Sequence, residues 1–298
     1  MIPLDFTKID RQTITAEWLP AANISLEVLR LDTLHPVVSG NKIYKLKYYL
    51  QDAVQQGYTT IATFGGAWSN HIVATAYVCQ LAGLNSVGII RGEEAPALSK
   101  TLQNAEQYGM KLIYVTREQY KNKEEVKQSF TKNNWYWINE GGYGIQGAKG
   151  AAEILTSVDL AKYTHIIAAV GTGTMLAGVI QSSLPGQQVI GVSSMKGNTS
   201  LHELVLGLIP GTSQKNFTIL HDYHFGGYGN HPQSLIEFIN QVYLQHNLPL
   251  DIVYTGKAFY AVKDLVQKQF FQPGSKLLII HSGGLQGNSS LGDKVLTF

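Results

Sequence analysis

Hydrophobic and polar residues alternate along the chain in a way that predicts strands and helices in turn. Residues 24–31 alternate in polarity and predict a strand, and apolar residues at helical spacing from Ile43 predict a helix that ends at Gly57. The same criteria predict further strands over 59–64, 86–90, 111–116, 165–170, 188–194 and from Lys276. They predict further helices over 71–83, 99–109, 118–132, 148–160, 175–183, 199–208, 233–247 and most of 251–270. Strands that alternate with helices are typical of an α/β fold with parallel sheets, and two such series predict two lobes.

Four predicted strands end in polar turns. These turns are Trp68-Ser69-Asn70-His71, Gly171-Thr172-Gly173-Thr174, Tyr254-Thr255-Gly256-Lys257 and His281-Ser282-Gly283-Gly284. In open α/β sheets, ligands bind beyond the carboxyl ends of the strands. We therefore expect the four turns to form one site.

Lys42 lies in the first turn of a predicted helix, just after Asn41 at the N-cap position. Free amide groups and the helix dipole disfavour an ammonium there, which would lower the pKa of the lysine. Such a lysine is a candidate nucleophile that forms an imine. The alternative is that Lys42, Lys45 and Lys47 form a solvated helix face.

The Gly-Thr-Gly-Thr turn at 171–174 has the features of an anion-binding cup, because it connects a strand to a helix N-terminus. A dinucleotide site would have glycine at Leu176 and an acidic residue near Ser194, and a nucleotide P-loop is absent at Lys257. A small phosphorylated cofactor fits better. A tight glycine turn without a ligand is the alternative.

The remaining polar candidates have structural alternatives of their own. Ser69 is either an N-cap or a functional group, and Tyr254 is either a buried aromatic or a catalytic group. Successive polar groups at Asn70 and His71 indicate function, since they have little structural purpose at a strand end. The histidines around His224 match no metal-binding spacing, so no metal is expected.

Composition places the chain among ordinary globular proteins. Its 298 residues are 44% hydrophobic and 15% charged, with a formal net charge of +2. Basic residues are scattered, so we expect no nucleic-acid partner. The single cysteine, Cys79, fits a reducing compartment. The N-terminal residues lack the pattern of a signal peptide and no apolar run reaches membrane-spanning length, so we expect a cytoplasmic protein without a membrane partner.

An imine lysine, a phosphate cup and a strand-end hydroxyl at Ser282 are the groups that pyridoxal phosphate requires. The sequence also resembles the family of D-cysteine desulfhydrase and 1-aminocyclopropane-1-carboxylate deaminase, which has the tryptophan-synthase-β-like fold. The resemblance covers Gly40 to Gly287, with the motifs SGNK, GG-SNH, EGG, GTGT-LAG, VYTGKA and HSGG in the family's order.

This resemblance implies a role for each matching position. Lys42 would carry the cofactor through an imine, Asn70 would bond its 3′ oxygen, residues 171–174 would hold its phosphate, and Ser282 would meet its pyridine nitrogen. The implied catalytic residues are Lys42, Ser69 and Tyr254. The substrate, a small amino acid, would be bound by Trp68, Ser69, Asn70, His71 and His224.

The resemblance also implies an organisation in two domains. A small domain of about residues 50–135 would be set into a large cofactor-binding domain formed by 1–49 and 136–298, and the protein would be a homodimer.

Several positions depart from the family pattern. Relatives commonly have Arg at Tyr44, Gln at Trp68 and Arg at Val73. The deaminases carry Glu at the position of Thr255, where it meets the pyridine nitrogen, and a second tyrosine that we align with His224.

These departures favour β-elimination. Opening a cyclopropane ring needs a strong electron sink, which a carboxylate supplies by keeping the pyridine nitrogen protonated, whereas a neutral serine does not. We therefore expect a lyase that converts D-cysteine to pyruvate, sulfide and ammonia. The alternatives are a 1-aminocyclopropane-1-carboxylate deaminase and, in another class, a non-catalytic protein that binds a phosphate ligand.

Overall fold

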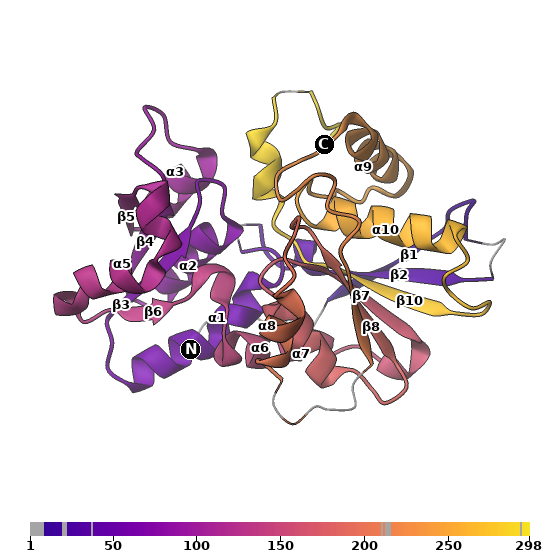
Figure 1. Ribbon diagram of the computed structural model, residues 1–298, viewed down its shortest axis with the longest axis horizontal. Coiled ribbons are helices and arrows are strands. Elements are labelled where there is room, and N and C mark those ends of the chain that lie inside the picture. The colour runs from indigo at the N-terminus through magenta and orange to yellow at the C-terminus, as the bar shows by residue number, and fades with distance from the viewer. Residues whose placement is uncertain (1–8, 20–22, 37, 210, 212–215, 293) are drawn as a thin grey trace.

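The computed structural model describes residues 9–19, 23–36, 38–209, 211, 216–292 and 294–298. It contains two sheets, each covered by helices, which confirms the expected α/β fold with two lobes (Figure 1). The larger sheet has the strand order β1 (Asp10–Ile14), β2 (Ser25–Arg30), β10 (Lys276–His281), β7 (His165–Val170), β8 (Gln188–Ser193) and β9 (Phe217–Leu220). Its neighbouring strands are parallel except for the antiparallel pair β1–β2.

The smaller sheet is parallel throughout. Its order is β5 (Met110–Val115), β4 (Asn85–Arg91), β3 (Thr60–Gly65) and β6 (Tyr136–Ile138). Because Tyr136 pairs with Ile61, the four-stranded sheet includes residues just beyond the expected boundary at 135. The division into 1–49 with 136–298 and 50–135 stays a prediction.

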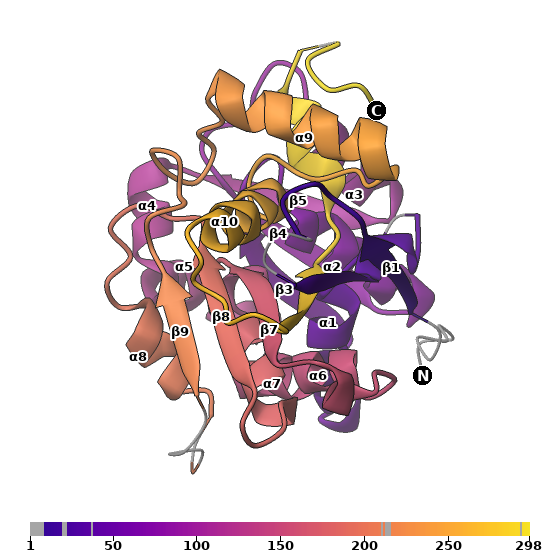
Figure 2. The same cartoon turned by 90° about the vertical axis from the view of Figure 1, so that its right-hand side faces the viewer.

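The helices are α1 (Lys42–Gln55), α2 (Asn70–Leu81), α3 (Lys100–Gln107), α4 (Arg117–Lys121), α5 (Lys123–Ser129), α6 (Ile145–Ala152), α7 (Thr174–Ser182), α8 (Leu201–Leu206), α9 (Gln233–His246) and α10 (Thr255–Gln267). On the large sheet, side chains alternate between two cores, as the pleat of a strand requires. Leu278 and Ile280 of β10 face the core shared with α1, α6 and α7, whereas Leu277 and Ile279 face α9 and α10. Figure 2 shows these helix layers on opposite faces of the sheet.

Helix α1 connects the two sheets through one hydrophobic core. Its Leu46 belongs to the same buried cluster as Ile61 of β3, Val78 of α2 and Leu278 of β10. The two sheets are therefore held together by a shared core that includes α1, the helix that begins at Lys42.

Two predicted helices differ from those in the structure. The helix expected over 118–132 is interrupted at Asn122, whose backbone is not helical and whose side chain accepts a hydrogen bond from the Glu125 amide as the cap of α5. The helix expected over 148–160 begins earlier, at Ile145, and α6 ends at Ala152. Part of the glycine-rich segment 139–150 is thus helical, and Gly150 allows α6 to pack closely on α1, since a Cβ there would lie 1.9 Å from the Tyr44 oxygen.

The described residues include no helix with the length and apolarity needed to cross a membrane. They also include no cluster of three or more His, Cys, Asp or Glu side chains that could hold a metal ion. Cys79 is buried as a free thiol.

Candidate active site

The segment before α1 meets the turn after β10. The Asn41 amide donates to the Ser282 carbonyl at 2.9 Å, and the Gly284 amide donates to Ser39 Oγ at 3.2 Å. Gly40 has a φ of +83°, and a Cβ there would lie 1.8 Å from the Ser282 oxygen. Only glycine fits both the backbone conformation and this close approach, so the contact brings Lys42 beside the end of β10.

Lys42 is the first residue of α1, as predicted, but its environment differs from the expected one. Its Nζ donates to Asn41 Oδ1 at 2.7 Å, and Asn41 Nδ2 contacts Met175 Sδ at 3.0 Å instead of capping the helix. Burial lowers the pKa of Lys42 from 10.5 to about 8, and the negative charge of Asp251 opposes this shift. Desolvation therefore has the effect that we had assigned to the helix terminus.

The expectation of a solvated lysine face is wrong for Lys45. This side chain is only 5% exposed, and its Nζ donates to the Gly141 carbonyl at 3.1 Å. Burial, followed by the nearby Lys42, holds the pKa of Lys45 well below its ordinary value. Lys47, in contrast, is partly exposed and pairs with Glu153 at 2.6 Å. The spacing of three residues between Lys42 and Lys45 placed both on one helix face, and this signal could have identified Lys45.

The turn Gly171–Thr174 connects β7 to α7, and its role as an anion-binding cup stays a prediction. Gly173 has a φ of +84°, and the Thr172 and Thr174 hydroxyl oxygens lie 3.1 Å apart. The first amides of α7 have no partners within the helix and are available to an anion. A Cβ on Gly141 would lie 2.9 Å from Thr172 Cγ2, so the carbonyl that binds Lys45 is adjacent to the cup.

Asn70 begins α2 and faces the turn after β10. Its Nδ2 donates to the Gly284 carbonyl at 2.9 Å, whereas its buried Oδ1 has no hydrogen-bond partner among the described residues. The preceding Ser69 is an N-cap, since its Oγ accepts a bond from the Ile72 amide at 3.4 Å. The role of Ser69 toward a substrate stays a prediction.

His71 is buried behind the start of α2, and its expected contact with a substrate stays a prediction. The ring is only 2% exposed, and its Nε2 is 2.8 Å from Thr63 Oγ1. Because the Thr63 hydroxyl donates to the Ile138 carbonyl, Nε2 is the protonated ring nitrogen. Burial, with the charges of Lys42 and Lys45, lowers the pKa of His71 well below its ordinary value, so the ring is neutral.

The positions that depart from the family pattern divide between the core and the surface. Trp68 is 38% exposed and precedes Ser69, the cap of α2. Tyr44 and Val73 are buried core residues instead.

Tyr254 extends over the cup, and its partner is a second tyrosine. A Cβ on Gly171 would lie 3.0 Å from the Tyr254 ring, and the Tyr254 hydroxyl donates to the Tyr228 hydroxyl at 3.2 Å. His224, aligned above with the second tyrosine of the deaminases, accepts a bond from the Gly226 amide within its own loop. Tyr228 was missed because a glycine-rich loop gives no register from sequence. Burial raises the pKa of Tyr254 well above its usual value, so the phenol keeps its proton.

Thr255 faces the protein interior. Its hydroxyl and amide both donate to Asp251 Oδ2, at 2.5 and 2.9 Å, and the Tyr254 amide donates to Oδ1 at 2.6 Å. The Asp251 carboxylate thus caps the start of α10. The residue that follows β10, Ser282, instead lies where Gly40 and Asn41 approach.

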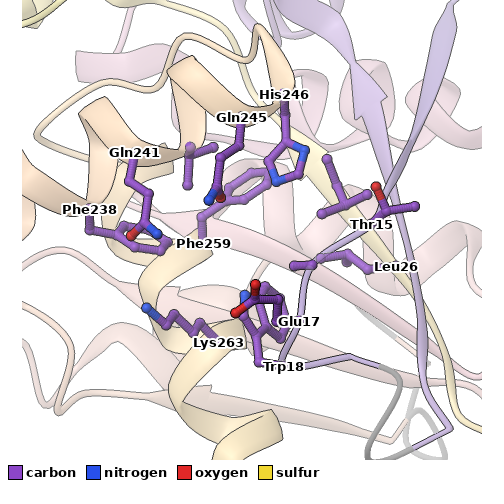
Figure 3. Close-up of a pocket in the computed structure, with 13 residues that line it drawn as sticks. Thr15, Glu17, Trp18, Leu26, Phe238, Gln241, Gln245, His246, Phe259 and Lys263 are labelled. Carbon is purple, nitrogen blue, oxygen red and sulfur yellow. The ribbon is translucent and has the colours of Figure 1, made fainter.

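A separate cavity of about 300 Å³ lies away from this site (Figure 3). It is lined from α9, α10 and the β1–β2 hairpin, with Leu26 and Phe259 among its apolar residues. Leu26 pairs with Leu277 near the start of β10, whereas Ser282 follows the end of that strand. The cavity therefore lies near the start of β10, and the site lies at the opposite end of this strand.

The site residues fit pyridoxal phosphate. A lysine amine of lowered pKa can condense with its aldehyde, and the amides of α7 with the Lys45 side chain can bind its phosphate. The unpartnered Oδ1 of Asn70 can accept a bond from a protonated ring oxygen or imine nitrogen, and Ser282 offers a neutral hydroxyl.

Comparison with known proteins agrees with this fit. A putative 1-aminocyclopropane-1-carboxylate deaminase of Pyrococcus horikoshii is 30% identical, over 94% of this chain and 92% of its own. The bifunctional D-cysteine desulfhydrase/1-aminocyclopropane-1-carboxylate deaminase of Arabidopsis thaliana is 29% identical, over 87% and 71% respectively. A crystal structure described as an ACC deaminase homologue superposes with a TM-score of 0.81 at 26% identity, and the match covers 99% of this chain and 94% of that one. The family model described as pyridoxal-phosphate dependent enzyme matches residues 14–283, and the chain therefore belongs to that family.

Proposed function

We propose that the protein is a lyase that converts D-cysteine and water to pyruvate, hydrogen sulfide and ammonia. The observation that carries this proposal is the orientation of Thr255, whose hydroxyl is engaged by Asp251 at 2.5 Å. The neutral Ser282 is then the group for the pyridine nitrogen. A neutral partner supports a weaker electron sink, which suffices when a leaving thiol departs from Cβ.

The cofactor would be held by Lys42, the α7 amides with Lys45, Asn70 and Ser282. When bound, pyridoxal phosphate withdraws electrons from the Cα of an attached amino acid. Asn41 Oδ1 orients Lys42 Nζ at 2.7 Å, and the lowered pKa of this amine allows it to accept the Cα proton. Ser69 is the second candidate for this proton.

The tyrosine pair would serve the leaving group. Tyr254 keeps its proton because burial raises the pKa of its phenol, and its contact with Tyr228 fixes the direction of the hydroxyl. Because the Tyr254 hydroxyl donates to Tyr228, the proton of Tyr228 is the free one, and Tyr228 can donate it to the sulfur as the Cβ–S bond breaks. The tyrosine that gave its proton to the sulfur would then regain one from the Lys42 side of the site, which would complete the cycle.

The test is an assay of the cofactor-loaded enzyme with D-cysteine, with L-cysteine as the matched stereochemical control. We expect equal amounts of sulfide and pyruvate from D-cysteine. Absence of both products would rule out this substrate.

One observation favours a second candidate, the deaminase of 1-aminocyclopropane-1-carboxylate. The deaminases use two tyrosines, and Tyr228 and Tyr254 are in contact here. Thr255 speaks against this candidate because it has no carboxylate to offer. Formation of 2-oxobutyrate from the cyclopropane substrate at a rate above that of sulfide from D-cysteine would reverse our ranking.

Membership of an enzyme family argues against the non-catalytic phosphate-binding alternative.

The expected homodimer and the cytoplasmic location are part of this proposal. Sedimentation would test the homodimer, and fractionation of cells would test the location.

A further inference from the structure

Lys257 of α10 is a buried charged residue that the reaction described above does not use. Its side chain is 1% exposed. Its Nζ donates to three backbone carbonyls, those of His224 at 3.0 Å, Gly227 at 2.7 Å and Tyr228 at 3.1 Å. An ammonium has three donors, so each of them has one partner.

The three carbonyls converge because the loop has an unusual backbone. Phe225, Gly226 and Gly227 have φ angles of +53°, +94° and +140°, and the loop turns at these residues so that the carbonyls of His224, Gly227 and Tyr228 face one point. A left-handed conformation costs a residue such as Phe225 about 1 kcal/mol or more. Something must compensate for that cost, and the shared cation is bonded to the carbonyls on both sides of the strained residues.

The cation joins the two halves of the tyrosine pair. Tyr228 provides one of the three carbonyls, and Tyr254 lies three residues before Lys257, at the start of the same helix. The hydroxyl oxygens of the same two tyrosines lie 3.2 Å apart. One ammonium therefore connects the element that carries Tyr254 to the loop that carries Tyr228.

We propose that Lys257 is a positioning residue, an internal cation in a cage of three carbonyls that sets Tyr228 against Tyr254. Without the ammonium, the cage is a site for a monovalent cation such as potassium or ammonium, since carbonyl oxygens are ligands for hard cations. The effect of this positioning on catalysis rests on the proposed function, whereas the contact of Lys257 with the three carbonyls does not depend on it.

The charge state agrees with this role. Burial lowers the pKa of Lys257 to about 8, and the Asp251 carboxylate opposes the shift. The side chain is therefore mostly an ammonium at pH 7.

The experiment compares Lys257→Ala with wild type, both loaded with cofactor, by amide hydrogen exchange of residues 221–230 in choline chloride. In this variant we expect exchange at least ~10-fold faster, because charge-assisted hydrogen bonds are lost. Potassium or ammonium chloride should restore slow exchange, whereas wild type should respond to neither salt. Lys263→Ala is the matched control, since this lysine is on the same helix but faces the Phe238 ring.

Activity provides a second and separate measurement. Lys257→Ala should lower kcat more than it raises KM, potassium or ammonium should restore part of the loss, and Tyr228→Phe should not respond to either cation. If no substrate is turned over by any variant, the proposed function fails while the exchange result still decides on the cage.

Unchanged exchange in Lys257→Ala, or faster exchange that neither cation reverses, would overturn the proposal. Should the alanine variant not fold, Lys257→Gln keeps a neutral donor in the same space. We expect faster exchange of the loop in the Lys257→Gln variant also. Exchange at the wild-type rate in that variant would contradict the need for a positive charge.

Discussion

At the scale of single residues, Lys42 derives its reactivity from burial. A lysine with a pKa of about 8 is half neutral at that pH, whereas an ordinary lysine would be neutral only above 10.5. The lowered pKa is a property of the cofactor-free protein, in which the amine is not yet bound.

We predict that the rate at which cofactor-free protein combines with pyridoxal phosphate rises with pH and levels off above a midpoint near 8. The rise follows from the sign of the shift, because only the neutral amine attacks the aldehyde and its fraction grows as pH passes the lowered pKa. Rapid-mixing absorbance at a series of pH values measures this midpoint. A midpoint near 10.5 would show that burial does not control the amine.

The residues that sequence patterns could identify are those defined by local context. Asn70 and the turn 171–174 lie at helix starts shortly after a strand, and Lys42 lies at a helix start after a Gly-Asn turn, positions that the chain alone indicates. Spacing could have indicated Lys45, but the contacts of Lys45 and Tyr228 could not be predicted because they join residues about a hundred and about thirty positions apart. The inward orientation of Thr255 likewise depends on the Asp251 side chain and not on spacing.

At the scale of elements, the site depends on close backbone contact between the start of α1 and the end of β10. Gly40 and Gly283 touch each other, and a Cβ on Gly283 would lie 2.4 Å from Gly40 Cα. Neighbouring strands and helices were mostly predictable from periodicity. This contact was not, because it joins segments that are far apart in the sequence.

We predict that Gly40→Ala destabilises the protein by about 3 kcal/mol or more, through steric overlap in addition to backbone strain. Gly57→Ala is the matched control, because Gly57 has a similar φ of +78° but open space around its Cα. Backbone strain alone should cost that control about 1–2 kcal/mol. Urea unfolding followed by circular dichroism measures both values, and equal losses for the two variants would contradict the close contact.

Elements that the sequence did not predict are short or irregular. The strands β1, β6 and β9 contain few residues and little alternation, and they are defined by pairing with a neighbouring strand. Asn122 divides a charged segment that has helical character on both sides. In these cases tertiary pairing and a local cap outweigh propensity.

At the scale of the whole molecule, the two sheets bring the turns after β3, β7 and β10 to one place with the start of α10, which follows α9 and not the strand expected before Tyr254. Helix α1 contributes to the core shared by both sheets, and Lys42 lies at its first turn. Turns from both sheets approach this lysine, with Asn70 from one and Ser282 from the other. The fold class and this convergence were predictable because parallel sheets place their ligand sites at the carboxyl ends of strands.

The central claim, that Lys42 anchors pyridoxal phosphate, is tested most directly by reducing the cofactor-loaded protein with borohydride and mapping the modified peptide. We predict one phosphopyridoxyl group on Lys42 and loss of the visible absorbance band, with Lys45 and Lys257 unmodified. A Lys42→Arg variant should remain unlabelled under the same conditions. Labelling of another lysine, or a protein that stays colourless with added pyridoxal phosphate, would contradict the account.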